Sequence, residues 1–85
     1  MEEERIGKVV KYFAKPSVAA VEMTAGVLRV GDSIHIKGHT TDFEDTVHSM
    51  EVEKESIEEA PAGYLIGIKV KDRVREGDEV FKVLS

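Results

Sequence analysis

Histidine and acidic side chains gather in one polar stretch of this 85-residue chain, where their types suit metal binding. Imidazole nitrogens and carboxylate oxygens are ligands for zinc and other divalent ions. The spacing matches no defined metal motif, so we expect surface side chains that flank a polar loop, with no metal bound. The stretch contains His35, His39 and His48 together with Asp42, Glu44 and Asp45.

A second group of chemically capable residues is basic. The densest cationic cluster comprises Lys69, Lys71, Arg73 and Arg75. The chain as a whole has a formal charge of −5, which argues against a protein that follows nucleic acid by its overall field. A local patch could still contact several phosphates, so we predict that this cluster binds RNA or a partner. The alternative is an ordinary strand end whose cations pair with Asp72, Glu76 and Glu79.

No catalytic motif is visible in the remaining residues. The chain has no cysteine, which excludes disulfides and thiolate catalysis. Its serines and threonines lack a glycine-rich nucleophile elbow, and no glycine loop ends in Lys followed by Ser or Thr. We predict that the chain is not an enzyme, needs no cofactor and binds no GTP. Phe43 stands alone among polar residues, and we expect it to plug one end of the fold; the alternative is contact with a partner.

Stretches of period-two alternation predict the strands that must position these side chains. The strongest covers residues 64–70, where Ile66, Ile68 and Val70 share one face and Leu65 lies on the other. A helix over residues 51–59 competes with a strand, but the Pro61-Ala62-Gly63 break favours the strand. Further strands are predicted at residues 5–13, 17–23, 27–30, 33–37, 46–55 and 80–84, and a polar loop at residues 38–45.

Glycines mark the turns between these strands. Gly31-Asp32 and Gly77-Asp78 each lead straight into an alternating apolar strand, so each pair is expected to form a tight corner. Gly63 and Gly67 are expected to allow close approach of neighbouring backbones. These glycines and aspartates are predicted to be structural.

The predicted architecture is all-β, a small closed antiparallel β-barrel of about six or seven strands. It forms one domain over residues 1–85, with residues 1–4 frayed and with a bulge or a close approach of backbones at Gly7. No apolar run of about 18 residues and no leader is present, so we expect a soluble cytoplasmic protein without membrane contact. The absence of Asn and Gln, with abundant Glu and Lys, favours a thermophilic source.

The order of these motifs resembles the β-barrel domain that follows the GTPase domain in elongation factor Tu and bacterial initiation factor. The matching segments are Val30-Gly31-Asp32-Ser33-Ile34, Ala62-Gly63-Tyr64-Leu65-Ile66-Gly67-Ile68-Lys69-Val70 and Glu76-Gly77-Asp78-Glu79-Val80. The resemblance implies a barrel that touches ribosomal RNA or the aminoacyl end of transfer RNA. The chain departs from that family because it contains no GTPase motif, which puts GTP-dependent translation in doubt.

A second resemblance lies in the middle of the chain. The segment Gly38-His39-Thr40-Thr41-Asp42-Phe43-Glu44 is similar to part of the small barrel at the end of collagenase-like peptidases, which do their chemistry elsewhere. The first predicted function is a translation-factor-like module that binds RNA or a ribosome-associated partner. The alternative is a protein-docking accessory domain for an enzyme such as a collagenase-like peptidase. Both are binding modules, and fold-level analogy cannot choose the ligand.

Overall fold

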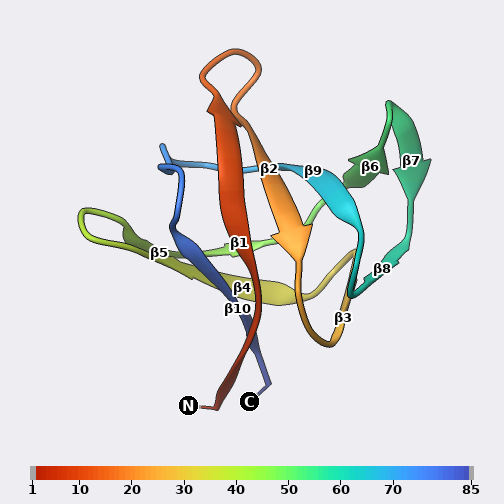
Figure 1. Cartoon of the computed structure of the whole chain (residues 1–85), viewed down its shortest axis with the longest axis horizontal. Coiled ribbons are helices and arrows are strands. Elements are labelled where there is room, and N and C mark those ends of the chain that lie inside the picture. Colours follow the sequence, from red (N-terminus) through yellow and green to blue (C-terminus); the bar gives the residue numbers. More distant parts are fainter. Residues whose placement is uncertain (1, 85) are drawn as a thin grey trace.

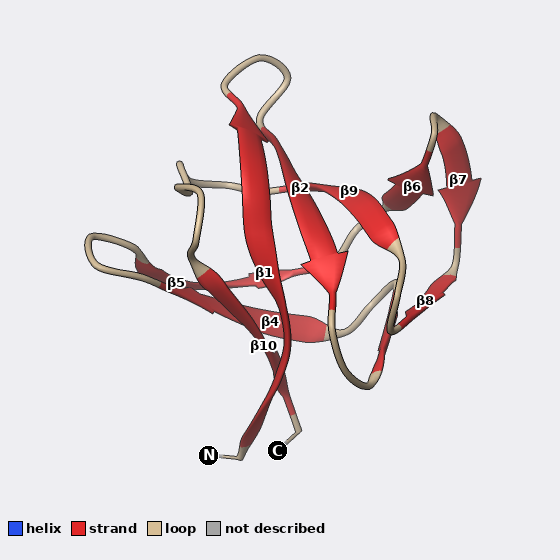
Figure 2. Ribbon diagram, viewed as in Figure 1, coloured by secondary structure: helices blue, strands red, loops and turns tan. Residues whose placement is uncertain are grey.

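The computed structural model describes residues 2–84, which form strands and turns without a helix (Figure 1, Figure 2). Eight strands of this part of the chain form one sheet in the order β5-β4-β10-β1-β2-β9-β6-β7, and β3 pairs with β8 in a second, two-stranded sheet. The strands are β1 (Glu3–Phe13), β2 (Val18–Met23), β3 (Val27–Arg29), β4 (Ser33–Lys37), β5 (Asp42–Thr46), β6 (Met50–Val52), β7 (Glu55–Ile57), β8 (Glu59–Pro61), β9 (Leu65–Lys69) and β10 (Glu79–Val83). Neighbouring strands run antiparallel, so the predicted all-β antiparallel architecture is confirmed.

Strand β1 is the central strand of the large sheet and begins earlier than the sequence indicated. Its pairing with β10 starts at Glu3, opposite Val83, and continues at Glu4, opposite Lys82. The prediction of a frayed start is therefore wrong for Glu3 and Glu4, because β10 supplies backbone hydrogen bonds to residues whose side chains are polar. Met1 lies outside the described residues.

A bulge interrupts β1 near its start, as predicted. The register with β10 shifts between Arg5 and Gly7. A Cβ atom at Gly7 would lie 2.5 Å from the backbone oxygen of Glu22 on β2, so the two strands approach too closely for any side chain at this position. The predicted bulge and close approach at Gly7 are both confirmed.

The large sheet is strongly bent, and in Figure 1 β4 and β5 run across the direction of β1 and β2. Its edge strands, β5 and β7, are not paired with one another, so the predicted closed barrel is not confirmed for residues 2–84. The backbone of Val47, directly after β5, bonds instead to the first Gly-Asp corner. Gly31 N donates to Val47 O at 2.8 Å, and Val47 N donates to Asp32 O at 2.9 Å.

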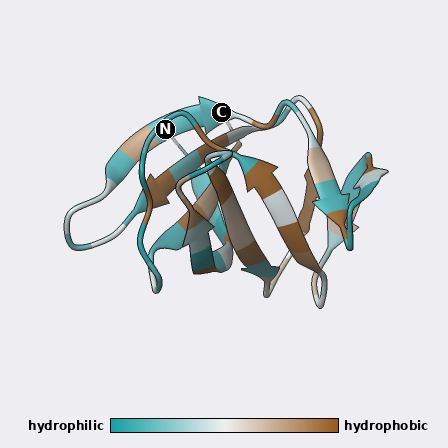
Figure 3. Ribbon diagram, turned by 90° about the horizontal axis from the view of Figure 1, so that it is seen from above, coloured by the Kyte–Doolittle hydropathy of each residue, from teal (hydrophilic) through white to brown (hydrophobic). Residues whose placement is uncertain are grey.

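Buried apolar side chains form one cluster. Hydrophobic and hydrophilic residues alternate along several of the strands that supply it (Figure 3). The residues predicted to face the core are at most 4% exposed; they are Ile34, Ile36, Ile66, Ile68 and Val70. Phe43 is half-buried and packs against this cluster. The interior contact expected of Phe43 is therefore present, although no closed barrel is found over residues 2–84.

Two predicted segments differ from the structure. Residues 38–45 were expected to be a loop, but β5 begins at Asp42 and pairs with β4. Alternating exposure is sufficient to form an edge strand, so polar residues can build one. The expected strand over residues 46–55 is interrupted and becomes a hairpin of β6 and β7, which also excludes the competing helix. Its two turn residues, Glu53 and Lys54, have φ values of 50° and 70°, a conformation that strains residues other than glycine.

The two Gly-Asp corners have the same geometry. Each is a four-residue turn that begins at an arginine, Arg29 or Arg75, and the glycines Gly31 and Gly77 have φ values of 100° and 91°. The aspartate at each corner bonds back to the arginine: Asp32 Oδ2 accepts from Arg29 N and Asp78 Oδ2 from Arg75 N, both at 2.8 Å. The predicted corners are confirmed. The turn at Gly63 also needs a positive φ, of 96°.

Valine at Gly31 or at Gly77 should lower the free energy of unfolding by roughly 1 to 3 kcal/mol, because an L residue pays for the left-handed conformation in both corners. Open space surrounds the Cβ position of both glycines within 4 Å, so backbone strain alone causes the loss. Thermal melts compare the two variants with Gly67→Val, whose backbone needs no positive φ. Melting temperatures equal to the parent's would contradict the turn assignment.

Candidate binding surface

The predicted basic cluster occupies the end of β9 and the connection to β10. All four cations, Lys69, Lys71, Arg73 and Arg75, are exposed. The connection is anchored by two valines, Val70 and Val74, which are 4% and 1% exposed. Its backbone is also tied to β5, because Lys71 N donates to Asp45 Oδ2 at 3.0 Å.

The four cations form no ion pair within residues 2–84, so the alternative pairing with Asp72, Glu76 and Glu79 is not observed there. Glu79 instead pairs with Arg5 across β10 and β1, at 2.6 Å. The cluster is thus accessible to an anionic ligand. Its role as a contact surface stays a prediction.

An apolar groove lies on the outer face of the large sheet. It encloses about 480 Å³ and is lined by residues of β1, β2, β6 and β9 and of the turn before β9. Three large apolar side chains with high exposure line it: Phe13 at 44%, Tyr64 at 43% and Leu65 at 58%. Such side chains gathered at one place on a small protein are typical of an interaction surface.

Strand alternation explains why these side chains point outward. On β9, Ile66 and Ile68 face the core, which leaves Leu65 and Gly67 on the outer face. On β2, Ala19 is buried and its neighbours Val18 and Ala20 face outward with intermediate exposure. The register places Ala20 directly opposite Gly67, so the two smallest residues of this face meet and form a low floor.

A second, smaller cavity extends the groove. It has a volume of about 190 Å³ and shares Val18, Glu51 and Gly67 with the first. It reaches Pro16, Ser49 and Lys69. The prediction that Gly67 permits close backbone approach is wrong, since a Cβ atom there would have its nearest neighbour at 3.4 Å, an ordinary contact. The absence of a side chain at Gly67 instead keeps the groove open.

The three histidines are not gathered at one site. His39 and His48 are exposed, and residues 2–84 contain no group of His, Asp and Glu arranged to hold a metal ion. The expectation of surface histidines fails for His35, whose side chain is 16% exposed. His35 lies between two carboxylates, with Nδ1 2.6 Å from Glu3 Oε2 and Nε2 2.5 Å from Asp42 Oδ1.

This arrangement favours the charged imidazole, because only the doubly protonated ring can donate at both nitrogens. The hydrogen bond to Asp42 and the proximity of Glu3 raise the pKa of His35 above its ordinary value of 6.5, although burial opposes the shift. His35 in turn lowers the pKa of Asp42 below its ordinary 3.8. The cluster joins the start of β1 to the β4–β5 hairpin, so it is a structural clamp.

The clamp should make stability pH-dependent. The raised pKa of His35 means that its contribution is complete below pH 6.5 and is lost as the pH rises through the raised value. The lowered pKa of Asp42 means that its contribution is present above 3.8 and is lost as the pH falls through the lowered value. Melting temperatures measured across this range should fall on the alkaline side in the parent and in the control His48→Gln. If the melting temperature of the parent changes with pH in the same way as that of His35→Gln, the clamp is contradicted.

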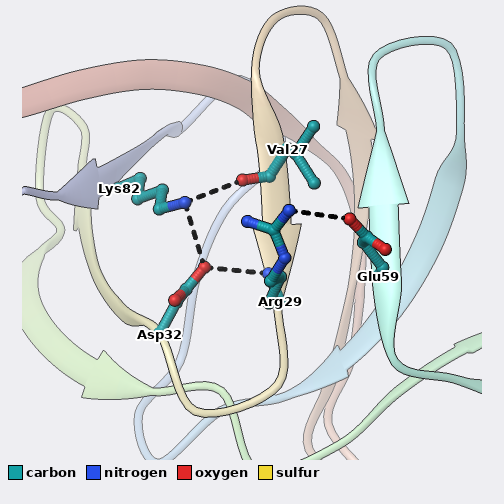
Figure 4. A network of polar contacts seen from close by, with 5 residues as sticks. All are labelled: Val27, Arg29, Asp32, Glu59 and Lys82. Carbon is teal, nitrogen blue, oxygen red and sulfur yellow. Dashed lines mark hydrogen bonds and ion pairs between the residues drawn. The ribbon is translucent and has the colours of Figure 1, made fainter.

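A second polar network surrounds the first corner (Figure 4). Lys82 Nζ on β10 donates to Val27 O at 3.0 Å and lies 3.3 Å from Asp32 Oδ2. Arg29 Nη2 on β3 pairs with Glu59 Oε1 on β8 at 2.8 Å. The network attaches the two-stranded sheet to β10, and Asp32 takes part in it through Lys82 and Arg29.

The fold is that of a domain known from peptidases. The structure superposes on the C-terminal domain of a candidate U32 peptidase from Geobacillus thermoleovorans with a TM-score of 0.88, covering 95% of this chain and 93% of that one at 20% identity. A selenomethionine variant of the same domain gives a TM-score of 0.84 over 91% of this chain and 96% of that one, also at 20% identity. These likenesses show the fold alone.

Sequence comparison finds similar segments in a protease and in a collagenase. The chain is 42% identical over 77 residues to an uncharacterized protease of Methanocaldococcus jannaschii, and 37% identical over 78 residues to a collagenase of Porphyromonas gingivalis. These matches cover 89% and 91% of this chain but only 19% and 22% of the two relatives. No protein-family model matches the chain. The resemblance to collagenase-like peptidases is confirmed, whereas the resemblance to translation factors is not shown.

Proposed function

We propose that this chain is a non-catalytic accessory domain that docks on a protein of the U32 peptidase and collagenase class. The observation that carries the proposal is the exposed apolar groove lined by Phe13, Tyr64 and Leu65. Apolar side chains left outside a core of this size are the usual anchors of a protein interface. The relatives support the choice of partner, because in them a similar segment belongs to a chain about five times as long.

The absence of catalysis in this domain is part of the proposal. His35 is half-buried, but it contacts two carboxylates and no hydroxyl group that it could activate. Peptide-bond chemistry would then belong to the remaining parts of the peptidase. Residues 2–84 contain no helix with the length and apolarity of a membrane span.

The translation-factor function predicted first is less well supported than its alternative, since the relatives are peptidase-like. RNA binding therefore serves as the competing outcome of the test. It would follow the basic cluster of Lys69, Lys71, Arg73 and Arg75 and weaken steeply with salt. Docking through the groove would follow apolar contacts and tolerate salt.

Cross-linking in an extract of the source cells tests the docking function. Lys54 and Lys69 line the two cavities of the groove, so a lysine-reactive cross-linker should join them to a peptidase of this class. Lys37, on β4 and outside both of these cavities, is the internal control. Mass spectrometry should find the same links after ribonuclease treatment and in a Lys71→Ala, Arg73→Ala, Arg75→Ala variant. If ribosomal RNA is recovered instead, and is lost after ribonuclease treatment and in the triple variant, the proposal is overturned.

A further inference from the structure

We infer that the groove binds an extended polypeptide segment with a lysine or arginine between two apolar side chains. This inference rests on the docking function proposed above and names the chemistry of the docked segment. It follows from the shape of the floor and from the position of one carboxylate beside it.

The floor accommodates a chain in the extended conformation. Ala20 and Gly67 meet at its centre, and the groove continues on both sides of Gly67 through the second cavity. Larger apolar side chains stand beside this low point: Phe13 and Val18 on one side, Leu65 on another. Apolar side chains of a bound segment would pack against these walls, and its centre would lie over Gly67.

Glu51 supplies the charge that selects the central side chain. It stands opposite Gly67 in the β6–β9 pairing. Its Cγ and Oε1 lie 3.6 Å and 3.9 Å from the place that a Cβ atom of Gly67 would occupy, so the carboxylate overhangs the floor. A lysine or arginine would lay its aliphatic stem on the apolar floor and bring its cation to Glu51.

The rim carries charges of both signs. Neither Glu51 nor Glu53 has an ion-pair partner among residues 2–84, so both carboxylates are available to a ligand. Glu53 and Lys54 form the two-residue hairpin turn at the groove edge. Lys54 and Lys69 also line the two cavities, so the preference for a cation rests on the position of Glu51 over the floor and not on the net charge of the rim.

Synthetic peptides test the inference on the purified chain. The probe is a blocked pentapeptide with the core Val-Arg-Val, and the matched controls carry Val-Glu-Val or Ser-Arg-Ser. In amide NMR titrations the Val-Arg-Val peptide should shift Ala20, Leu65 and Gly67, with a dissociation constant of about 0.1 to 1 mM. Each control peptide should bind about tenfold more weakly, because one lacks the cation and the other lacks the apolar contacts.

Two variants locate the binding. Gly67→Val fills the floor with a residue that favours strands, so it should abolish the shifts while the protein stays folded. Glu51→Gln removes the overhanging charge and should weaken Val-Arg-Val about tenfold without affecting the weaker binding of a neutral Val-Ala-Val peptide. Glu44→Gln, an exposed residue of β5 outside both cavities, is the control and should bind as the parent does.

Several results would overturn the inference: no shifts at millimolar Val-Arg-Val, equal binding of Val-Glu-Val, or full binding by Gly67→Val. If sedimentation shows a dimer that is lost in Gly67→Val, the occupant of the groove is a second copy of this chain, and the inference is overturned as well. Cross-links from Lys54 or Lys69 to a peptidase, with no preference for Val-Arg-Val, would retain the docking function and reject only its chemistry. Val-Arg-Val binding without peptidase cross-links would reject the docking function alone.

Discussion

Alanine at Gly38 is expected to lower the free energy of unfolding by about 2 to 4 kcal/mol, although it adds only one methyl group. A Cβ atom there would lie 2.6 Å from Asp78 Cγ, well inside contact distance. The Asp78 carboxyl cannot easily move aside, because its side chain is buried and Oδ2 accepts a hydrogen bond from Arg75 N at 2.8 Å. Displacing it would break the second Gly-Asp corner.

A double-mutant cycle separates this clash from other causes. Asp78→Ala alone should cost about 1 to 3 kcal/mol, because Arg75 N loses its acceptor. Adding Gly38→Ala to Asp78→Ala should cost less than about 1 kcal/mol, since the clashing atoms are gone. Denaturant unfolding gives each free energy. An equal cost of Gly38→Ala in both backgrounds would show that Asp78 is not what excludes a side chain from Gly38.

Leu28→Ala is expected to destabilise the fold about as much as Gly38→Ala, for a different reason. Leu28 has no exposed surface, and it lies on β3 opposite Ala60. Truncation would leave a cavity between the two-stranded sheet and the core and cost about 2 to 5 kcal/mol. For a domain of this size the melting temperature should fall by at least about 8 °C.

Leu65→Ala is the matched control, because the same atoms are removed from a side chain that is 58% exposed. Its free energy of unfolding should change by no more than about 0.5 kcal/mol. Its effect should appear in docking, since Leu65 lines the groove. Equal melting temperatures for Leu28→Ala and the parent would contradict the packing of β3 and β8 on the core.

The sequence predicted those parts of the fold that depend on local alternation. Ile66, Ile68 and Val70 were assigned to the core because an isolated strand already shows which face is apolar. The Gly-Asp corners were equally visible, since a turn is a local structure. Strand β5 was missed because its less exposed face carries Phe43 and the polar Asp45, which give no apolar repeat.

The candidate site depends on pairing between distant segments, which the sequence does not display. That Leu65 faces away from the core was predicted from β9 alone. That Ala20 meets Gly67, and that Glu51 stands opposite Gly67, follows from the registers between β2, β9 and β6. The clamp around His35 was missed for the same reason, because Glu3 lies 32 positions away along the chain. The basic cluster was visible because its residues are close neighbours in sequence.

The two ends of the described chain meet, since Leu84 N donates to Glu2 O at 2.8 Å (Figure 1). Phe13 and Val18 lie at the other end of β1 and β2, roughly 30 Å away along an 11-residue strand. A domain with this geometry can be inserted into a surface loop of a host protein through one narrow stalk, with little distortion of either fold. It can also be circularly permuted, by joining its ends and opening the exposed turn at Lys15 and Pro16. The domain, together with its groove, can therefore be transferred between proteins as one unit.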